Sequence, residues 1–146
     1  MQEGSDVVEL RSSPLDVSAA VAAAGDAGGG AITIFLGTIR PETREDGRKL
    51  AGLEYEAYCE MAEAQMRGLV AEARRRWPIC RLVMLHRIGR VEVGQPSVLI
   101  AVSTPHRAQG FEACRFFIDQ LKAQATIWKK EIWEDGSSTW PGIERR

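Results

Sequence analysis

Residues 97–124 read SVLIAVSTPHRAQGFEACRFFIDQLKAQ, and the pattern of apolar residues changes within them. Ser97–Ser103 is an apolar run that predicts a buried strand. From Pro105 to Gln124 apolar residues recur at helical spacing among charged ones, which predicts a long helix. Thr104 is placed to cap that helix and Pro105 to occupy its first position. The chain is therefore expected to combine strands and helices in one fold.

The rest of the chain interleaves the same two kinds of element. Further strands are predicted at Val7–Leu10, Ala31–Ile39, Leu53–Tyr58, Arg81–Ile88 and Ile127–Trp133, and helices at Val17–Ala24 and Met61–Trp77. VEVGQP should hold a short strand and a turn, and a last strand should return through Ser138 and Trp140. Because only some strands are separated by helices, we expect an α+β fold with a mixed or mostly antiparallel sheet, two long helices and one short helix.

Length and composition limit the class of protein. The 146 residues suit one domain, 1–146, in which the polar stretch 41–49 is expected to be a mobile loop. The formal net charge of -1 gives no overall attraction to nucleic acid or to an anionic membrane. The first residues, MQEGSDVVEL, do not resemble a signal peptide, so a cytoplasmic location is expected. The three cysteines form no CxxC pair, and neither disulfides nor a metal site are expected.

His106 and Arg107 fall in the first turn of the helix predicted from Pro105. The positive end of the helix dipole disfavours cations there, and a bound anion would relieve the mismatch. Free backbone N–H groups at a helix N-terminus also point toward such an anion. The alternative is that Arg107 bends into solvent while His106 packs against the sheet, and this pattern alone does not choose between the two.

Three lysines occur near the end of the same helix, one within it and two in the strand that follows. Lys122 lies at the edge of the apolar stripe, where a partly desolvated amine suits proton transfer or a phosphate, although most such lysines only extend into solvent. Lys129 and Lys130 are adjacent in a predicted strand, so one of them should face a cleft, and periodicity does not say which. Arg40 ends a central strand, where binding groups are common, but a surface arginine is the commoner explanation.

Other reactive groups fit structural roles better. Cys114 belongs to the apolar stripe of the long helix and is expected in the core rather than as a nucleophile. His86 sits inside an apolar strand, where a hydrogen-bonded structural histidine is expected. GDAGGG lacks the lysine of a P-loop, and no serine nucleophile elbow occurs. A basic, metal-free site remains, in which positioning and charge stabilisation would carry catalysis.

The blocks FLGTIR, LEYEAY, RRRWPICRLVMLHRIG, HRAQGFEA and KAQATIWKKE, in this order from about Gly30 to Trp140, resemble the large, catalytic subunit of molybdopterin synthase. The resemblance implies an α/β hammerhead-like fold and a sulfurtransferase. Such enzymes add two sulfurs to cyclic pyranopterin monophosphate, and the dithiolene product, the metal-free precursor of the molybdenum cofactor, needs no cofactor in the enzyme. The sulfur comes from a small ubiquitin-like carrier with a C-terminal Gly-Gly thiocarboxylate, and the implied assembly is a homodimer within a heterotetramer.

The resemblance also implies residue roles. Lys122 and Lys129 match the two lysines of the reaction centre, which favours Lys129 over Lys130. The implied substrate-binding residues are Phe35, Thr38, Ile39, Arg40, His106, Arg107, Lys130 and Glu131. Three departures from the family pattern are Cys59 and Thr126, where proline is frequent, and Gly110, where alanine is common.

Two other functions compete with the enzyme. A non-catalytic pterin-binding or assembly module would keep the pocket and the carrier interface, but all matched chemical residues are present. A small nucleotide-binding or RNA-binding domain could use the same cations, yet the near-neutral charge and the lack of interleaved aromatic and basic residues disfavour it.

Overall fold

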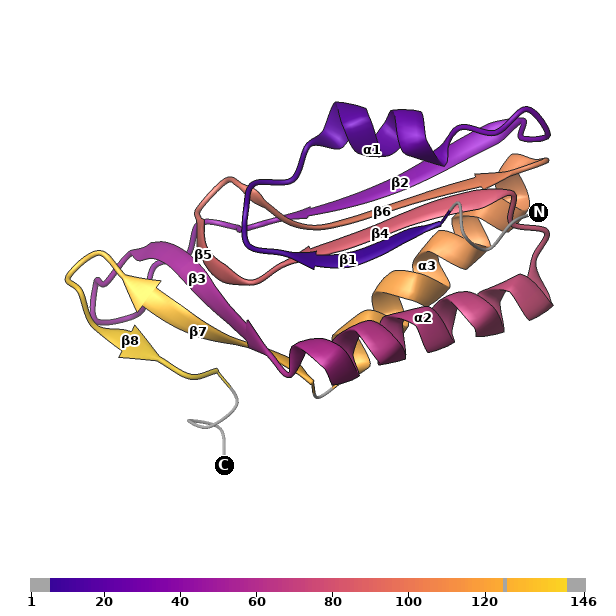
Figure 1. Ribbon diagram of the computed structural model, residues 1–146. Coiled ribbons are helices and arrows are strands. Elements are labelled where there is room, and N and C mark those ends of the chain that lie inside the picture. Colours follow the sequence, from indigo (N-terminus) through magenta and orange to yellow (C-terminus); the bar gives the residue numbers. More distant parts are fainter. Residues whose placement is uncertain (1–5, 125, 142–146) are drawn as a thin grey trace.

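The computed structural model describes residues 6–124 and 126–141 of the chain. Within them it contains three helices and two four-stranded sheets (Figure 1). The elements are, in order, β1 (Val7–Arg11), α1 (Val17–Ala24), β2 (Ala31–Thr38), β3 (Leu50–Ala57), α2 (Cys59–Arg76), β4 (Arg81–Arg87), β5 (Gly89–Glu92), β6 (Pro96–Thr104), α3 (Arg107–Ala123), β7 (Ile127–Trp133) and β8 (Ser138–Thr139).

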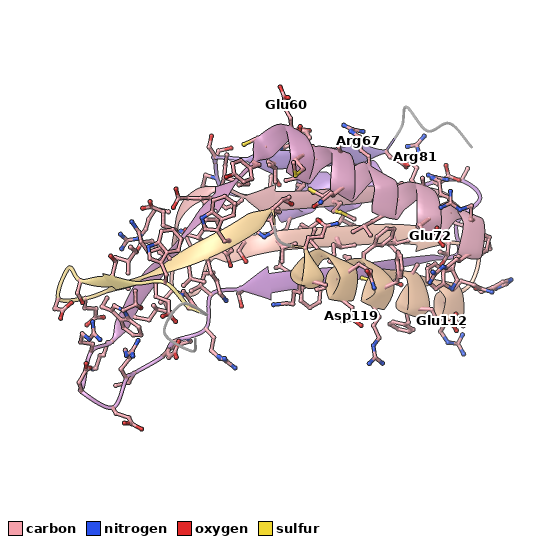
Figure 2. All side chains as sticks on the ribbon, turned by 90° about the horizontal axis from the view of Figure 1, so that it is seen from below. Glu60, Arg67, Glu72, Arg81, Glu112 and Asp119 are labelled. Carbon is pink, nitrogen blue, oxygen red and sulfur yellow. The ribbon has the colours of Figure 1, made fainter. Side chains whose placement is uncertain are left out.

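The first sheet has the order β1-β4-β6-β2 and lies between two layers of helix. Its β1·β4 pair is parallel, whereas β4·β6 and β6·β2 are antiparallel. Helices α2 and α3 lie side by side on one face and α1 on the other (Figures 1 and 2). The larger core fills the α2–α3 side and includes Met66, Leu82, Ile100 and Phe117, all fully buried. Asp119 projects from α3 on the side away from α2 (Figure 2).

The second sheet, β5-β3-β7-β8, is antiparallel throughout and has its own small core around Leu53, Val91 and Trp133. Strand β5 follows β4 after a single residue, and β3 follows β2 through the stretch 39–49, so both links join the two sheets. The predicted α+β class, with two long helices and one short helix, is confirmed. The division of the strands into two sheets is not apparent from the periodicity, which marks strands but not their partners.

Most predicted elements are confirmed within a few residues, and α1 has the predicted bounds. The predicted cap of α1 is present as well, because Asp16 Oδ1 accepts a hydrogen bond of 3.0 Å from the backbone N–H of Ala19. The predicted cap of α3 is wrong. The N-cap residue is His106, which makes no side-chain cap, and the Thr104 hydroxyl instead donates to the carbonyl oxygen of His106 at 2.7 Å.

The stretch 41–49 folds into a turn that pairs with itself and also contacts the Trp133 ring. Thr43 and Lys49 form an isolated antiparallel bridge, and the guanidinium groups of Arg44 and Arg48 each lie 5.4 Å from the centroid of the Trp133 ring. The mobility expected of this stretch stays a prediction. No helix in residues 6–124 and 126–141 is long and apolar enough to cross a membrane.

Candidate functional site

A cavity of about 1170 Å³ opens where the two sheets meet the last turn of α3. The polar and charged side chains that line it come from six segments. They are Thr38, Arg40, Glu42, Tyr55, His86, Ser97, Lys122, Lys129 and Glu131. Its apolar lining includes Phe35, Ile39, Ile118 and Trp128. The cavity therefore brings together groups that are up to about a hundred positions apart in the sequence. The topology of the fold, rather than proximity along the chain, places them side by side.

Lys122 reaches the cavity from the C-terminal turn of α3. The apolar side of this helix, with Cys114, Phe117 and Leu121, is buried against the first sheet, and Lys122 follows immediately after the last of these residues. Burial raises the pKa of the Cys114 thiol to about 11, which keeps it protonated and unreactive at neutral pH, as expected of a core cysteine. A lysine in a last helical turn is also favoured by the negative end of the helix dipole.

The register of β7 separates the two adjacent lysines. Lys129 pairs with Tyr55 of β3 and Glu131 pairs with Leu53, and all four residues line the cavity. Lys130 projects from the opposite face. Its amine lies 3.8 Å from a carboxylate oxygen of Glu54 and 5.7 Å from the centroid of the Trp140 ring. Of the two lysines that periodicity left undecided, Lys129 is the one that enters the cavity.

The environment of Lys129 lowers the pKa of its amine. Although the residue as a whole is exposed, loss of hydration at the amine is the largest cause, and the charges of Lys122 and Arg40 act in the same direction. Glu131 and Glu42 oppose them in part. A lysine with a lowered pKa releases a proton more readily, which suits a role in proton transfer.

Arg40 and its neighbours enter the cavity where β2 ends. The register of β2 against β6 shifts between Gly37 and Thr38, and Ile39 is then fixed by hydrogen bonds to the backbones of Gln95 and Gly94. Buried Ile39 anchors the segment, while Arg40 is exposed beside the opening. Phe35 lies on the same strand, on the side that packs against α3.

His106 and Arg107 lie at the other end of α3 and do not line the cavity. Arg107 begins the helix and Lys122 lies in its last turn, a separation of roughly 22 Å at about 1.5 Å of rise per residue. His106 and Arg107 are both exposed. They lie instead beside the start of β2, where Ala31 pairs with Thr104 (Figure 1). Within one chain they therefore cannot join Arg40 at the same ligand.

No pattern along the chain predicts that Tyr55, His86 or Trp140 lines the cavity. His86 is hydrogen-bonded and buried, as expected, but it also lines the cavity. The Tyr55 ring meets it edge-on with centroids 4.9 Å apart, and burial raises the pKa of the Tyr55 phenol. Alternation in LEYEAY marks Tyr55 as facing one side of a strand, but only the pairing of β3 with β7 shows that this side faces the cavity.

The departures at Thr126 and Cys59 both lie where the start of α2 meets the start of β7. Thr126 is buried, its hydroxyl donates to Gln65 Oε1 at 2.6 Å, and its carbonyl oxygen accepts from the backbone N–H of Tyr58 at 3.1 Å. Cys59 is exposed at the first position of α2. The start of β7 is thus tied to the start of α2 without a proline.

The lining combines two amines, one guanidinium group, one imidazole and two carboxylates with apolar walls. In residues 6–124 and 126–141 no group of three or more His, Cys, Asp and Glu side chains has an arrangement that could hold a metal ion. Cations converging in a partly apolar cavity are suited to a small anionic ligand and to stabilising negative charge that develops on it. Fold and cavity together define an α+β protein with a cavity that is suited to an anionic small molecule.

Comparison with known proteins identifies the family. Residues 10–124 match the family model described as MoaE protein, and the chain belongs to this family. The molybdopterin synthase catalytic subunit of a Nostoc species is 45% identical over 139 residues, which cover 94% of this chain and 83% of that protein. The crystal structure of molybdopterin synthase from Staphylococcus aureus has a TM-score of 0.85 and 36% identity, covering 92% of this chain and 96% of that one. These relatives agree with the resemblance seen in the sequence.

A more distant structure shares the fold. It is a complex of subunits 1 and 2 of molybdopterin-converting factor from Helicobacter pylori, with a TM-score of 0.73 and 22% identity over 94% of this chain and 89% of that one. At this level of identity the likeness concerns the fold alone.

Proposed function

We propose that this chain is the sulfur-transferring subunit of a molybdopterin synthase, which converts cyclic pyranopterin monophosphate into the dithiolene-bearing molybdopterin. One observation carries the proposal. Lys122, Lys129 and Arg40 converge from α3, β7 and the end of β2 on one cavity, in a chain of the MoaE family. Relatives that carry the name molybdopterin synthase catalytic subunit match nearly the whole chain.

In the proposed reaction the carrier's thiocarboxylate sulfur attacks the pterin side chain and the cyclic phosphate opens. Water then cleaves the carrier from the transferred sulfur, and a second carrier delivers the second sulfur. Negative charge develops on phosphate and carbonyl oxygens, where Arg40, Lys122 and Lys129 can stabilise it. The lowered pKa of Lys129 also suits it to donate a proton to a leaving oxygen.

The proposed partner is a small ubiquitin-like carrier whose Gly-Gly thiocarboxylate enters the cavity. The Helicobacter pylori structure with this fold is itself a two-subunit complex, which supports a protein partner. The proposed reaction needs no resident cofactor, and its product is metal-free. We place it in the cytoplasm, in keeping with three cysteines that are all free thiols.

The test of this function is reconstitution. The purified chain is mixed with thiocarboxylated carrier and cyclic pyranopterin monophosphate, and dithiolene formation and pterin binding are both measured. Stoichiometric formation of two thiolates per pterin supports the enzyme. Binding of pterin or carrier without any dithiolene would favour the non-catalytic module instead, and binding of neither would refute both.

We also propose that the chain forms a homodimer through β2, an edge strand of the first sheet. Ile32, Ile34 and Leu36 project from one face of it with 41%, 43% and 37% of their surface exposed. If a two-fold axis crosses this strand, the start of one copy's β2 lies beside the end of the other's. His106 and Arg107 then approach Arg40 of the second copy, which would reconcile their predicted role with their distance from Lys122.

Two measurements test the dimer. Ile34→Glu should convert a sedimenting dimer into a monomer, whereas Phe111→Glu, at an exposed position on α3, should not. A variant with His106→Ala and Arg107→Ala, mixed with a Lys129→Ala variant, should regain part of the lost activity, because one pocket of each mixed dimer is intact. Absence of any recovery in a mixture shown to exchange subunits would contradict a pocket built from two copies.

A further inference from the structure

His86 is a buried histidine whose position makes it more than a packing residue. It lies near the end of β4, with 8% of its surface exposed, and it lines the same cavity as Lys122 and Lys129. Along β4 it follows Leu82 and Met84 on the face that packs under α2 and α3. The His86 imidazole therefore lies at the border between the apolar core and the cavity.

The hydrogen bond of the ring determines its tautomer. His86 Nδ1 lies 2.7 Å from the carbonyl oxygen of Arg87, which can only accept. The proton of a neutral ring must then reside on Nδ1, which leaves a lone pair on Nε2. Nε2 has no hydrogen-bond partner in the part of the chain that the structure describes. The ring is held in place at one nitrogen and available as a base at the other.

The surroundings of His86 favour the neutral form of the ring. Burial lowers the pKa of the imidazole, and the positive charge of Lys122 lowers it further, whereas the bond to Arg87 opposes them. The charged groups lining the same cavity are Arg40, Glu42, Lys122, Lys129 and Glu131, and the Tyr55 phenol meets the ring edge-on. On the side of α2, Glu63 accepts a hydrogen bond from the backbone N–H of Leu10, the β1 partner of His86.

We propose that His86 is the base that deprotonates the water molecule which releases the carrier, and the inference rests on the proposed function. The water oxygen adds to the acyl carbon of the carrier–pterin thioester while its proton passes to Nε2 of His86. The C–S bond then breaks, and its electron pair stays on the sulfur, which remains on the pterin as a thiolate. The carrier leaves as a carboxylic acid that loses its proton to solvent, and His86 returns its proton to solvent before the next cycle.

Several other groups of the cavity are less suited to this step. The Arg40 guanidinium is a hydrogen-bond donor only and offers no acceptor for a proton. Glu131 already accepts a hydrogen bond of 2.8 Å from the Thr139 hydroxyl, and burial raises the pKa of Tyr55. The two amines are needed as cations beside phosphate and carbonyl oxygens. A neutral imidazole in the same cavity can take a proton without first losing one.

The test uses two variants that remove the base in different ways. In His86→Asn the side-chain amide can still donate to the carbonyl oxygen of Arg87, while no group with a basic lone pair remains. In His86→Gln the amide reaches toward the position of Nε2, but the bond to Arg87 is lost. Arg115→Ala, on the exposed side of α3, is the control, because its side chain is 84% exposed and outside the cavity.

The readout is a single turnover with thiocarboxylated carrier, followed by mass spectrometry of the quenched mixture and by turnover measured across pH. We expect both His86 variants to form the carrier–pterin adduct at the wild-type rate but to hydrolyse it about 100-fold more slowly or worse, so that the adduct accumulates. Wild-type turnover should fall on the acid side as His86 becomes protonated, and the residual turnover of His86→Asn should lack that limb.

The outcomes separate this inference from the proposed function. If the wild-type chain forms neither adduct nor dithiolene, the proposed function fails and the inference fails with it. The wild type could be active while a folded His86→Asn turns over without accumulating the carrier–pterin adduct and with an unchanged pH profile. In that case His86 is a structural residue, and only the inference is overturned. Slow adduct formation in both variants would also overturn it, because the defect would then precede release.

Discussion

Lys129 lies directly opposite Tyr55 in the antiparallel pair of β3 and β7. Side chains that face each other in such a pair project from the same side of the sheet, and here that side lines the cavity. A shift of one residue in this register would present Lys130 instead. The pairing in the second sheet, rather than a loop, therefore selects the lysine that faces the ligand, and the charges around it can be tested one at a time.

The pKa of Lys129 should respond in opposite directions to two substitutions. Lys122→Gln removes a nearby positive charge and is expected to raise the pKa, whereas Glu131→Gln removes a negative charge and is expected to lower it further. NMR titration of the reductively ¹³C-methylated lysines measures both shifts. Arg115→Gln, which removes a charge from the exposed side of α3, is the control, and a shift there equal to that of Lys122→Gln would contradict a local effect.

Thr139 is expected to hold Glu131 in position beside Lys129. The indole N–H of Trp133 donates to the Thr139 hydroxyl at 3.0 Å, and that hydroxyl donates to Glu131 Oε1 at 2.8 Å. Thr139→Val should lower the free energy of unfolding by about 1 kcal/mol and reduce turnover, whereas Thr139→Ser should keep both near wild type. Urea denaturation and turnover measure the two effects. Equal behaviour of the two variants would show that the hydroxyl has no role.

Gly110 should resist replacement by alanine, although alanine is the better helix former. A Cβ at this position would collide with the Thr33 hydroxyl and lie 3.0 Å from that of Thr104. We expect Gly110→Ala to destabilise the fold by about 1–3 kcal/mol and a second change, Thr33→Ala, to recover part of the loss. Gly68→Ala on α2, where a Cβ meets nothing within 4 Å, should instead stabilise by up to about 1 kcal/mol. Chemical denaturation of the wild type, the two single variants and the double variant measures these changes in the free energy of unfolding. A stabilising effect of Gly110→Ala would contradict the expected collision.

The elements were predictable because their signals are local. Asp16 before an alanine-rich run predicted α1 with its cap, and the apolar stripe from Phe111 to Leu121 predicted the body of α3. Thr104 misled because a threonine before a proline has the residue type of a cap without the geometry. Its hydroxyl bonds to His106, so the helix begins two residues later than Pro105.

The site was only partly predictable because it depends on pairing between distant strands. The resemblance identified Lys122, Lys129 and Arg40, which the cavity brings together. No pattern along the chain places Tyr55 or His86 beside them, since strand partners leave no local signal. The same reasoning grouped His106 with Arg40, although α3 separates the two within one chain.

If the two amines of the cavity carry out sulfur transfer, the rate of dithiolene formation in a single turnover must depend on both of them. Wild-type chain, Lys122→Ala, Lys129→Ala and the exposed-site control Arg115→Ala are each mixed with thiocarboxylated carrier and cyclic pyranopterin monophosphate. We predict that each lysine variant keeps the wild-type fold by circular dichroism but loses at least about 100-fold in rate, while the control is unaffected. Wild-type rates in both lysine variants would show that neither amine takes part in sulfur transfer.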